Sequence, residues 1–179
     1  IREHVKLLVG FGGSKNIDRK RFEESKEPRH FAISLTGEPT LYPKLRELIG
    51  RLHERGITSF LVTNGTMPDV LEGLRGCEPT QLYITLHAPD EQTYIKCCRP
   101  LIKNGWHRLL RSLETFENLN CRKVLRLTLV KGWNMIDPEG YARLIKKTAT
   151  NFVEFKAYMW VGYSRYRLPR EAMPTHEEV

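Results

Sequence analysis

The sequence has no long hydrophobic run, and this absence limits where the protein can reside. None of its apolar stretches approaches the roughly 20 residues that a helix needs to cross a bilayer. No signal-peptide pattern precedes the first strand-like segment. We therefore expect a cytoplasmic protein with no membrane partner. The chain begins at Ile1 rather than Met, and we expect further sequence upstream.

Cysteine is scarce and follows no ligand pattern. The four cysteines are Cys77, Cys97, Cys98 and Cys121, and no C-x-x-C pair occurs among them. This spacing matches neither a zinc site nor a disulfide framework. We expect free thiols in a reducing cytosol and assign no metal ligand within the chain. Internal repeats, low-complexity tracts and linkers are also missing, and the 179 residues suit one domain or most of a larger one.

The sequence has fewer acidic than basic residues. The sequence has 29 Lys and Arg against 21 Asp and Glu, which gives a net charge of +8. Such a balance favours a polyanionic partner, most simply a nucleic acid, although a solvated basic surface is the alternative and charge alone does not separate the two. Basic residues gather between Lys15 and Arg29 and recur after residue 160. The candidate RNA-binding residues are Lys15, Arg19, Lys20, Arg165, Arg167 and Arg170.

Strand-like apolar runs alternate with helical patterns along the chain. The runs are residues 31–35, 57–62, 81–84, 124–130 and 152–160. Helical spacing or capping signals occur at 2–9, 43–56, 68–74, 91–97, 106–116 and after Asp137, and 176–179 begins another helix. This order predicts an α/β fold with a parallel sheet, and the continuous apolar runs are typical of strands buried on both faces. Because five strands cannot close an eight-stranded barrel, we expect an incomplete TIM-like barrel whose first strand lies outside the chain.

Each strand-like run ends in a polar or glycine-containing turn. The turns are Thr36-Gly37-Glu38-Pro39, Thr63-Asn64-Gly65, Thr85-Leu86-His87, Lys131-Gly132-Trp133-Asn134 and Val161-Gly162-Tyr163-Ser164-Arg165. The carboxyl ends of parallel strands share one edge of a sheet, where ligands bind in barrels and doubly wound folds. We therefore predict that the five turns surround one mouth, with the two basic segments flanking it.

Several of these residues allow more than one chemical role. Glu38 can accept hydrogen bonds from an ammonium group or cap the helix that follows it. His87 can be a ligand, a base or a structural hydrogen-bond partner. Lys131 can pair with a carboxylate or phosphate, form an imine if desolvated, or remain solvated. The residues alone leave these alternatives open.

Specific strings of residues resemble a known family. The segments SLTGEPTLYP (34–43), FLVTNGT (60–66), PTQLYITLHAPDEQTY (79–94), RLTLVKGWN (126–134) and EFKAYMWVGYSR (154–165) occur in this order. RFEE (21–24), RPL (99–101) and MPTHEEV (173–179) accompany them. Together they resemble the tRNA 4-demethylwyosine synthases in their archaeal form, a family of radical S-adenosylmethionine (SAM) enzymes.

The resemblance implies a fold, a reaction and a set of partners. The fold would be a partial (βα)6 radical SAM barrel over residues 21–179, preceded by an N-terminal remnant at 1–20. The reaction, a radical carbon–carbon lyase chemistry, would use SAM and 4Fe-4S clusters. It would join two carbons of pyruvate to N1-methylguanosine beside the anticodon of phenylalanine tRNA, giving 4-demethylwyosine. An electron donor would be a further partner, and we expect a monomer.

The same resemblance suggests binding residues. Gly37, Glu38 and Pro39 match the segment that binds the methionine amino group of SAM, and Thr36 belongs to the same turn. The other candidates match strand-end positions that line the SAM and substrate cavity: Thr63, Asn64, Thr85, His87, Lys131 and Asn134. No catalytic residue is assigned.

One departure from the family is large. The C-x-x-x-C-x-x-C loop that ligates the cluster, and the lysine that holds pyruvate, lie upstream of Arg21 in the family and have no counterpart here. The four cysteines cannot replace that loop by their spacing, so we expect this chain to be inactive as given. The alternatives are a non-catalytic tRNA-binding module, another radical SAM enzyme acting on RNA, or a cluster-free lyase that uses Lys131.

Overall fold

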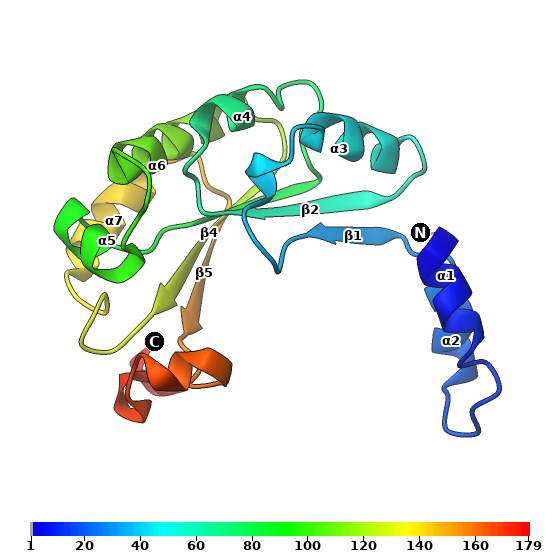
Figure 1. The fold of residues 1–179 in the computed structure, drawn as a ribbon. Helices are drawn as coiled ribbons and strands as arrows, with labels where there is room; N and C mark the ends of the chain where they lie inside the picture. Colours follow the sequence, from blue (N-terminus) through cyan, green and yellow to red (C-terminus); the bar gives the residue numbers. More distant parts are fainter. Residues whose placement is uncertain (1) are drawn as a thin grey trace.

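A five-stranded parallel sheet forms the centre of the computed structural model, which describes residues 2–179 (Figure 1). The strands are β1 (His30–Ile33), β2 (Thr58–Thr63), β3 (Gln81–Thr85), β4 (Arg122–Leu129) and β5 (Phe152–Ala157). They lie in the order β1-β2-β3-β4-β5, and every neighbouring pair is parallel. The predicted α/β fold with an open, incomplete barrel is confirmed.

Helices connect the strands. The α-helices of the described chain are α1 (Arg2–Val9), α2 (Arg19–Lys26), α3 (Leu45–His53), α4 (Pro68–Glu72), α5 (Glu91–Cys98), α6 (Gly105–Glu114) and α7 (Pro138–Lys146). Short 3-10 helices add η1 (Pro39–Leu41), η2 (Thr115–Asn118), η3 (Gly162–Tyr166), η4 (Arg170–Ala172) and η5 (His176–Glu178). The two predicted aspartate caps are present, since Asp90 accepts from Thr93 N at 2.8 Å and Asp137 from Gly140 N at 3.0 Å. In the described chain, no helix combines the length and apolar character needed to cross a membrane.

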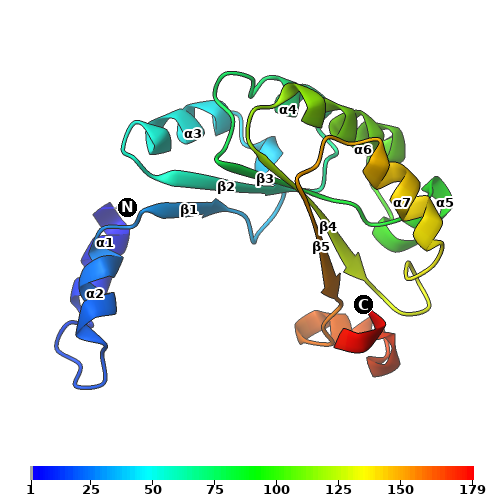
Figure 2. The ribbon, with the colours of Figure 1, turned by 180° about the vertical axis from the view of Figure 1, so that it is seen from behind.

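The helices that connect the strands gather on one side of the sheet. Figures 1 and 2 show α3, α4, α6 and α7 over the same face, while α1 and α2 form an arm beyond the amino end of β1. The face toward the helices carries the core, in which Leu61, Leu82, Ile84 and Leu125 are completely buried. Among the described residues, no helix covers the opposite, inner face (Figure 2).

Burial on both faces of the strands, which the apolar runs had suggested, is therefore wrong. Buried and half-buried residues alternate along β2 and β3 because only one face is covered. The inner face instead holds a row of stacked side chains. The rings of Phe60 and Tyr83 lie 4.6 Å apart, Arg126 stacks on Tyr83 at 4.6 Å, and Arg126 pairs with Glu154 at 2.7 Å.

Some predicted boundaries need correction. The run at 152–160 ends as a strand at Ala157, and the run at 31–35 ends at Ile33. The helix predicted from Pro43 begins at Leu45, and the segment at 176–179 forms only one 3-10 turn. Helix α2 had no counterpart in the prediction, although Asp18 caps it by accepting from Arg21 N at 3.1 Å.

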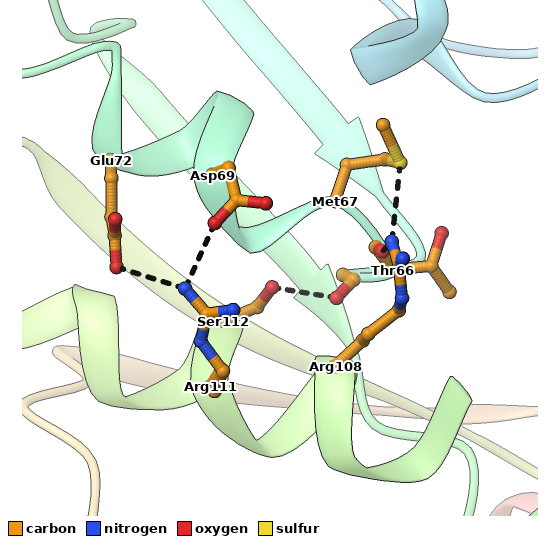
Figure 3. Close-up of polar contacts among 8 residues, drawn as sticks. Thr66, Met67, Asp69, Glu72, Arg108, Arg111 and Ser112 are labelled. Atoms are coloured by element: carbon orange, nitrogen blue, oxygen red, sulfur yellow. Dashed lines mark hydrogen bonds and ion pairs between the residues drawn. The ribbon is translucent and has the colours of Figure 1, made fainter. Parts of the chain in front are cut away.

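Helix α6 fixes the turn that follows β2, as Figure 3 shows. The buried Ser112 hydroxyl donates to the carbonyl of Gly65 at 2.6 Å, and Arg108 donates to the carbonyl of Thr66 at 3.3 Å. One turn further along α6, Arg111 pairs with Asp69 of α4 at 2.9 Å and with Glu72 at 3.7 Å. The turn after β2 is thus held from the helix side of the sheet.

Gly65 is the residue of this turn that tolerates no side chain. Its φ of 71° lies in the left-handed region, and an added Cβ would lie 2.7 Å from Leu109 and 2.9 Å from Ile84. The substitution Gly65→Ala is expected to lower the free energy of unfolding by about 2–4 kcal/mol, because overpacking and backbone strain add. Urea unfolding of the full-length protein measures it.

Gly132→Ala is the matched control, since Gly132 has a similar φ of 74° but nothing within 4 Å of an added Cβ. It should lose only the strain contribution of about 1–2 kcal/mol. Equal losses for the two variants would show that packing around Gly65 contributes nothing.

Candidate functional site

The polar turns after β1, β2, β3 and β4 meet at one cavity, which has a volume of about 770 Å³. Its polar lining comes from Glu38, Asn64, Thr66, His87, Thr128 and Asn134. Facing them is an apolar wall from the loop after α5, with Pro100, Leu101 and Ile102. The prediction that these strand ends share one mouth is confirmed, since Glu38 and Asn64 are in direct contact there. The turn after β5 lies at the same carboxyl edge, because β5 is parallel to β4.

Glu38 joins the first two turns. One carboxylate oxygen, Oε1, accepts from Thr40 N at 3.1 Å, from the Thr40 hydroxyl at 2.6 Å and from the Thr63 hydroxyl at 2.6 Å. The other, Oε2, accepts from Asn64 N at 2.8 Å. Glu38 therefore caps η1, as the structural alternative proposed, and also holds the turn after β2. A single accepted bond leaves Oε2 able to accept another from a ligand in the cavity.

Thr63 and Asn64 shape the second turn. The buried Thr63 hydroxyl accepts from Gly65 N at 3.1 Å while donating to Glu38. The Asn64 side-chain oxygen accepts from Thr66 N at 2.9 Å and from the Thr66 hydroxyl at 2.6 Å. Within the described chain the Asn64 amide N–H2 donates to no protein group. At this turn, that donor and Glu38 Oε2 are available to a ligand.

Asn134 holds the ends of β3 and β4 together. It is 3% exposed, and its amide nitrogen donates to the carbonyls of His87 at 2.8 Å and Thr128 at 2.9 Å. Its side-chain oxygen accepts from Val130 N at 2.7 Å. Both N–H groups are thus used within the protein, so Asn134 lines the cavity mainly as a structural residue.

His87 contributes an uncharged ring to the cavity. Burial lowers the pKa of His87 below its usual value of 6.5. At neutral pH the ring is therefore neutral, with one nitrogen able to donate and the other able to accept. This electrostatic state suits contact with a neutral polar ligand group better than contact with an anion.

The remaining predicted residues are not part of the cavity lining. Thr36 and Gly37 lie in the turn before Glu38, where Gly37 has a φ of 76°, and Pro39 begins η1. Thr85 lies on the inner face of β3, beside Arg126 in the register. Lys131 is exposed and pairs with Glu178 at 2.6 Å. Because Lys131 is exposed and ion-paired, the structure does not support the desolvated amine that imine formation at this residue requires.

The basic segments separate into two regions. Residues 165–170 follow the carboxyl end of β5 at the mouth, as predicted, and Arg165 stacks on Trp160 at 5.3 Å. The arm with Lys15, Arg19 and Lys20 enters β1 at its amino end (Figure 1). Its predicted position on the approach to the mouth is therefore wrong, because the amino ends of parallel strands lie at the opposite edge.

The cysteines form no metal site in the described chain. All four are free, and no three metal-ligating side chains gather among residues 2–179. Burial raises the pKa of the Cys98 thiol to about 12 and that of the Cys121 thiol to about 11. These thiols therefore stay protonated near neutral pH in the protein as described.

Sequence reasoning missed one wall of the cavity. Arg99 ends α5 in the left-handed region with a φ of 43°, and the chain then turns so that Pro100, Leu101 and Ile102 face the mouth. Only the string RPL pointed to this loop. No polar motif or periodicity marks it, since its contribution is apolar contact.

The fold and the grouped turns agree with comparisons to known proteins. The profile of the radical SAM superfamily matches residues 19–145, and that of wyosine base formation matches residues 147–179. The chain therefore belongs to the radical SAM superfamily. It is 51% identical over 181 aligned positions to the S-adenosyl-L-methionine-dependent tRNA 4-demethylwyosine synthase of Pyrococcus abyssi, covering 100% of this chain and 53% of that protein.

Solved structures show the same likeness. The structure of TYW1 with a lysine–pyruvate adduct bound has a TM-score of 0.86 and 39% identity, and the match covers 99% of this chain and 56% of that one. The crystal structure of archaeal TYW1 has a TM-score of 0.78 and 36% identity over 98% of this chain and 55% of that one. The chain thus spans about half the length of the relatives that it matches.

The Glu38 contacts predict a loss of stability when the carboxylate is removed. A glutamine at position 38 places an N–H2 group where one oxygen now accepts, so the bond from either Thr40 N or Asn64 N is lost. Glu38→Gln is expected to lower the free energy of unfolding by about 1–3 kcal/mol. Urea unfolding of the full-length protein measures the change.

Glu47→Gln on α3 is the matched control, because Glu47 makes only an exposed ion pair with Arg51. Its loss should stay below about 0.5 kcal/mol. Equal stability of the Glu38 variant and the wild type would show that the carboxylate does not hold the two turns together.

The lowered pKa of His87 predicts a pH dependence of stability. The unfolded chain binds a proton at His87 near pH 6.5, whereas the folded protein binds it only at lower pH. The free energy of unfolding therefore falls as the pH drops below about 6.5. Chemical unfolding at about pH 7.5 and 5.5 should show a larger loss for the wild type than for His87→Gln. An identical loss in both proteins would mean that His87 protonates equally in the folded and unfolded states.

Proposed function

We propose that the full-length protein is a tRNA 4-demethylwyosine synthase, a radical SAM carbon–carbon lyase. Its reaction would join two carbons of pyruvate to N1-methylguanosine beside the anticodon of phenylalanine tRNA. The observation that carries the proposal is the 51% identity to the Pyrococcus abyssi enzyme across the whole of this chain. The match of residues 147–179 to wyosine base formation supports the same reaction.

The cavity residues fit SAM. The volume of about 770 Å³ lies within the range of about 300–1,000 Å³ that is usual for small-molecule sites. Glu38 Oε2 offers an acceptor for the methionine ammonium group, and the Asn64 amide offers a donor for its carboxylate. The apolar wall at 100–102 offers a surface for the adenosine part. In this proposal SAM and an iron–sulfur cluster supply the radical chemistry, and residues outside this chain supply the cluster ligands.

The other partners follow from the same proposal. Pyruvate and an electron donor are co-substrates of the reaction, and tRNA is the acceptor. The net charge of +8 supports a polyanionic partner, since phosphate contacts dominate RNA binding. We propose that Arg165, Arg167 and Arg170 contact the RNA, because they lie at the edge of the sheet that contains the cavity.

The full-length protein should convert SAM to 5'-deoxyadenosine when its cluster is reconstituted and reduced under anaerobic conditions. With pyruvate and phenylalanine tRNA containing N1-methylguanosine, it should also give RNA that contains the 4-demethylwyosine nucleoside. Liquid chromatography with mass spectrometry detects both products, and unmethylated tRNA is the negative control.

Absence of 5'-deoxyadenosine despite a loaded cluster would refute a radical SAM activity and leave a non-catalytic tRNA-binding role. Formation of 5'-deoxyadenosine with a different RNA product would retain the superfamily chemistry and exclude 4-demethylwyosine synthesis.

A further inference from the structure

A second cleft, with a volume of about 890 Å³, adjoins the cavity described above. Three segments form it: the end of α5 with Arg99, the turn after β4 with Trp133, and the segment after β5 with Tyr163 and Arg167. It shares Cys97, Cys98, Arg99 and Val130 with the Glu38 cavity. These shared residues place the two spaces next to each other at the mouth.

The cleft combines aromatic surface with positive charge. Trp133 and Tyr163 contribute rings, and Arg99 and Arg167 contribute guanidinium groups. The described residues that line the cleft include no carboxylate. Lys96 adds a further cation, with its ammonium group 5.2 Å from the centre of the Trp133 ring. A ligand that fits such a lining is anionic and carries a flat ring.

The segment that carries Tyr163 is fastened to the sheet. Tyr158 N donates to the carbonyl of Leu129, and Lys131 N donates to the carbonyl of Ala172, each at 2.9 Å. The Trp160 indole donates to the carbonyl of Leu168 at 2.9 Å. Glu178, an acidic residue of this segment, pairs with Lys131 at 2.6 Å. The segment therefore holds a fixed position beside the turn after β4.

Tyr163 itself stays open to solvent. Its side chain is 84% exposed, although aromatic rings of this size are usually largely buried. An exposed ring on a fixed backbone, beside arginines, is the arrangement with which proteins stack the bases of single-stranded nucleic acids. Each base offers a flat face to the ring, and each phosphate offers an anion to an arginine.

We propose that this cleft binds a nucleotide of a single-stranded RNA loop, with its base stacked on Tyr163 or Trp133 and its phosphate on Arg99 or Arg167. The inference rests on the proposed function, which makes tRNA the substrate and its anticodon loop the reacting part. A nucleotide seated in the cleft positions its neighbour in the chain at the shared wall of Cys97, Cys98 and Arg99. That neighbour, unstacked from the loop, can then approach the SAM that the proposed function places in the Glu38 cavity.

The first test measures RNA binding by the full-length protein. The probe is the anticodon stem-loop of phenylalanine tRNA, and the variants are Tyr163→Leu and Tyr163→Phe. Loss of the ring should weaken binding about 5- to 100-fold, while the phenylalanine variant should stay within about twofold of the wild type. Phe152→Leu is the matched control, because Phe152 is also exposed but lies at the amino end of β5. Wild-type affinity in Tyr163→Leu and Trp133→Leu alike would overturn the proposal.

The second test separates stacking from charge. An abasic nucleotide in the loop should lower the affinity of the wild type for the RNA. It should lower the affinity of Tyr163→Leu little further, because that variant already lacks the ring on which the base stacks. Arg167→Ala should lower the slope of log affinity against log salt by about one unit, with exposed Arg55→Ala at the opposite edge as control. If Arg167→Ala lowers the salt slope but the abasic nucleotide has no effect on binding, the stacked nucleotide is refuted and the RNA contacts the cleft only through its phosphates.

The outcomes also separate this inference from the proposed function. If the wild type forms 5'-deoxyadenosine and binds the stem-loop, but the cleft variants bind it equally well, the cleft proposal fails and the proposed function stands. If the cleft variants lose RNA binding while the wild type forms no 5'-deoxyadenosine, the cleft is an RNA site and the proposed function fails. Equal competition by an acidic polypeptide would identify a protein partner and overturn the RNA assignment.

Discussion

The five strands bury only one of their two faces, and the arrangement of the functional residues depends on this constraint. Helices supply the apolar cover on one side, so Leu61, Leu82 and Leu125 can pack there without water. Polar side chains can then occupy the opposite face, where Arg126 pairs with Glu154 above an aromatic row. Because helices cover one face of the sheet, the turns at its carboxyl edge are bonded to helices on that side, as Ser112 bonds to Gly65. On the inner side the same turns stay open to a ligand.

Glu38 shows how one residue serves both stability and recognition. Its four accepted hydrogen bonds bring the turns after β1 and β2 together, so the carboxylate is held in place before any ligand arrives. A group that is already oriented loses less conformational entropy on binding. Structural capping and ligand binding, which the sequence presented as alternatives, are therefore compatible at this position. Asn134 is different, because its donors are used up within the protein.

The sequence was sufficient to predict the alternation of strands and helices, the parallel sheet and the shared edge of the turns. Alternating apolar runs and helical periodicity reflect local geometry, and parallel pairing places all carboxyl ends together. It could not show that only one face is covered, because apolar residues such as Phe60 and Val62 also line the inner side. The arm with Lys15 and Arg19 was also misplaced, because a cluster of basic residues in the sequence does not show at which edge of the sheet it will lie. The wall at 100–102 could not be predicted because it contains no polar motif. The structural role of Asn134 could not be predicted because it depends on a contact with His87, which lies 47 positions away in the sequence.

The strand order has a consequence for how the chain acquires its shape. Each of the strands β2 to β5 pairs with the strand that precedes it in the sequence. Among the described strands, none must wait for a later segment of the chain before it can pair with its neighbour. During synthesis each βα unit can dock as it leaves the ribosome, in the order of translation. The cavity edge is then assembled progressively, and among the described segments the one after β5, with Tyr163 and Arg167, follows all five strands.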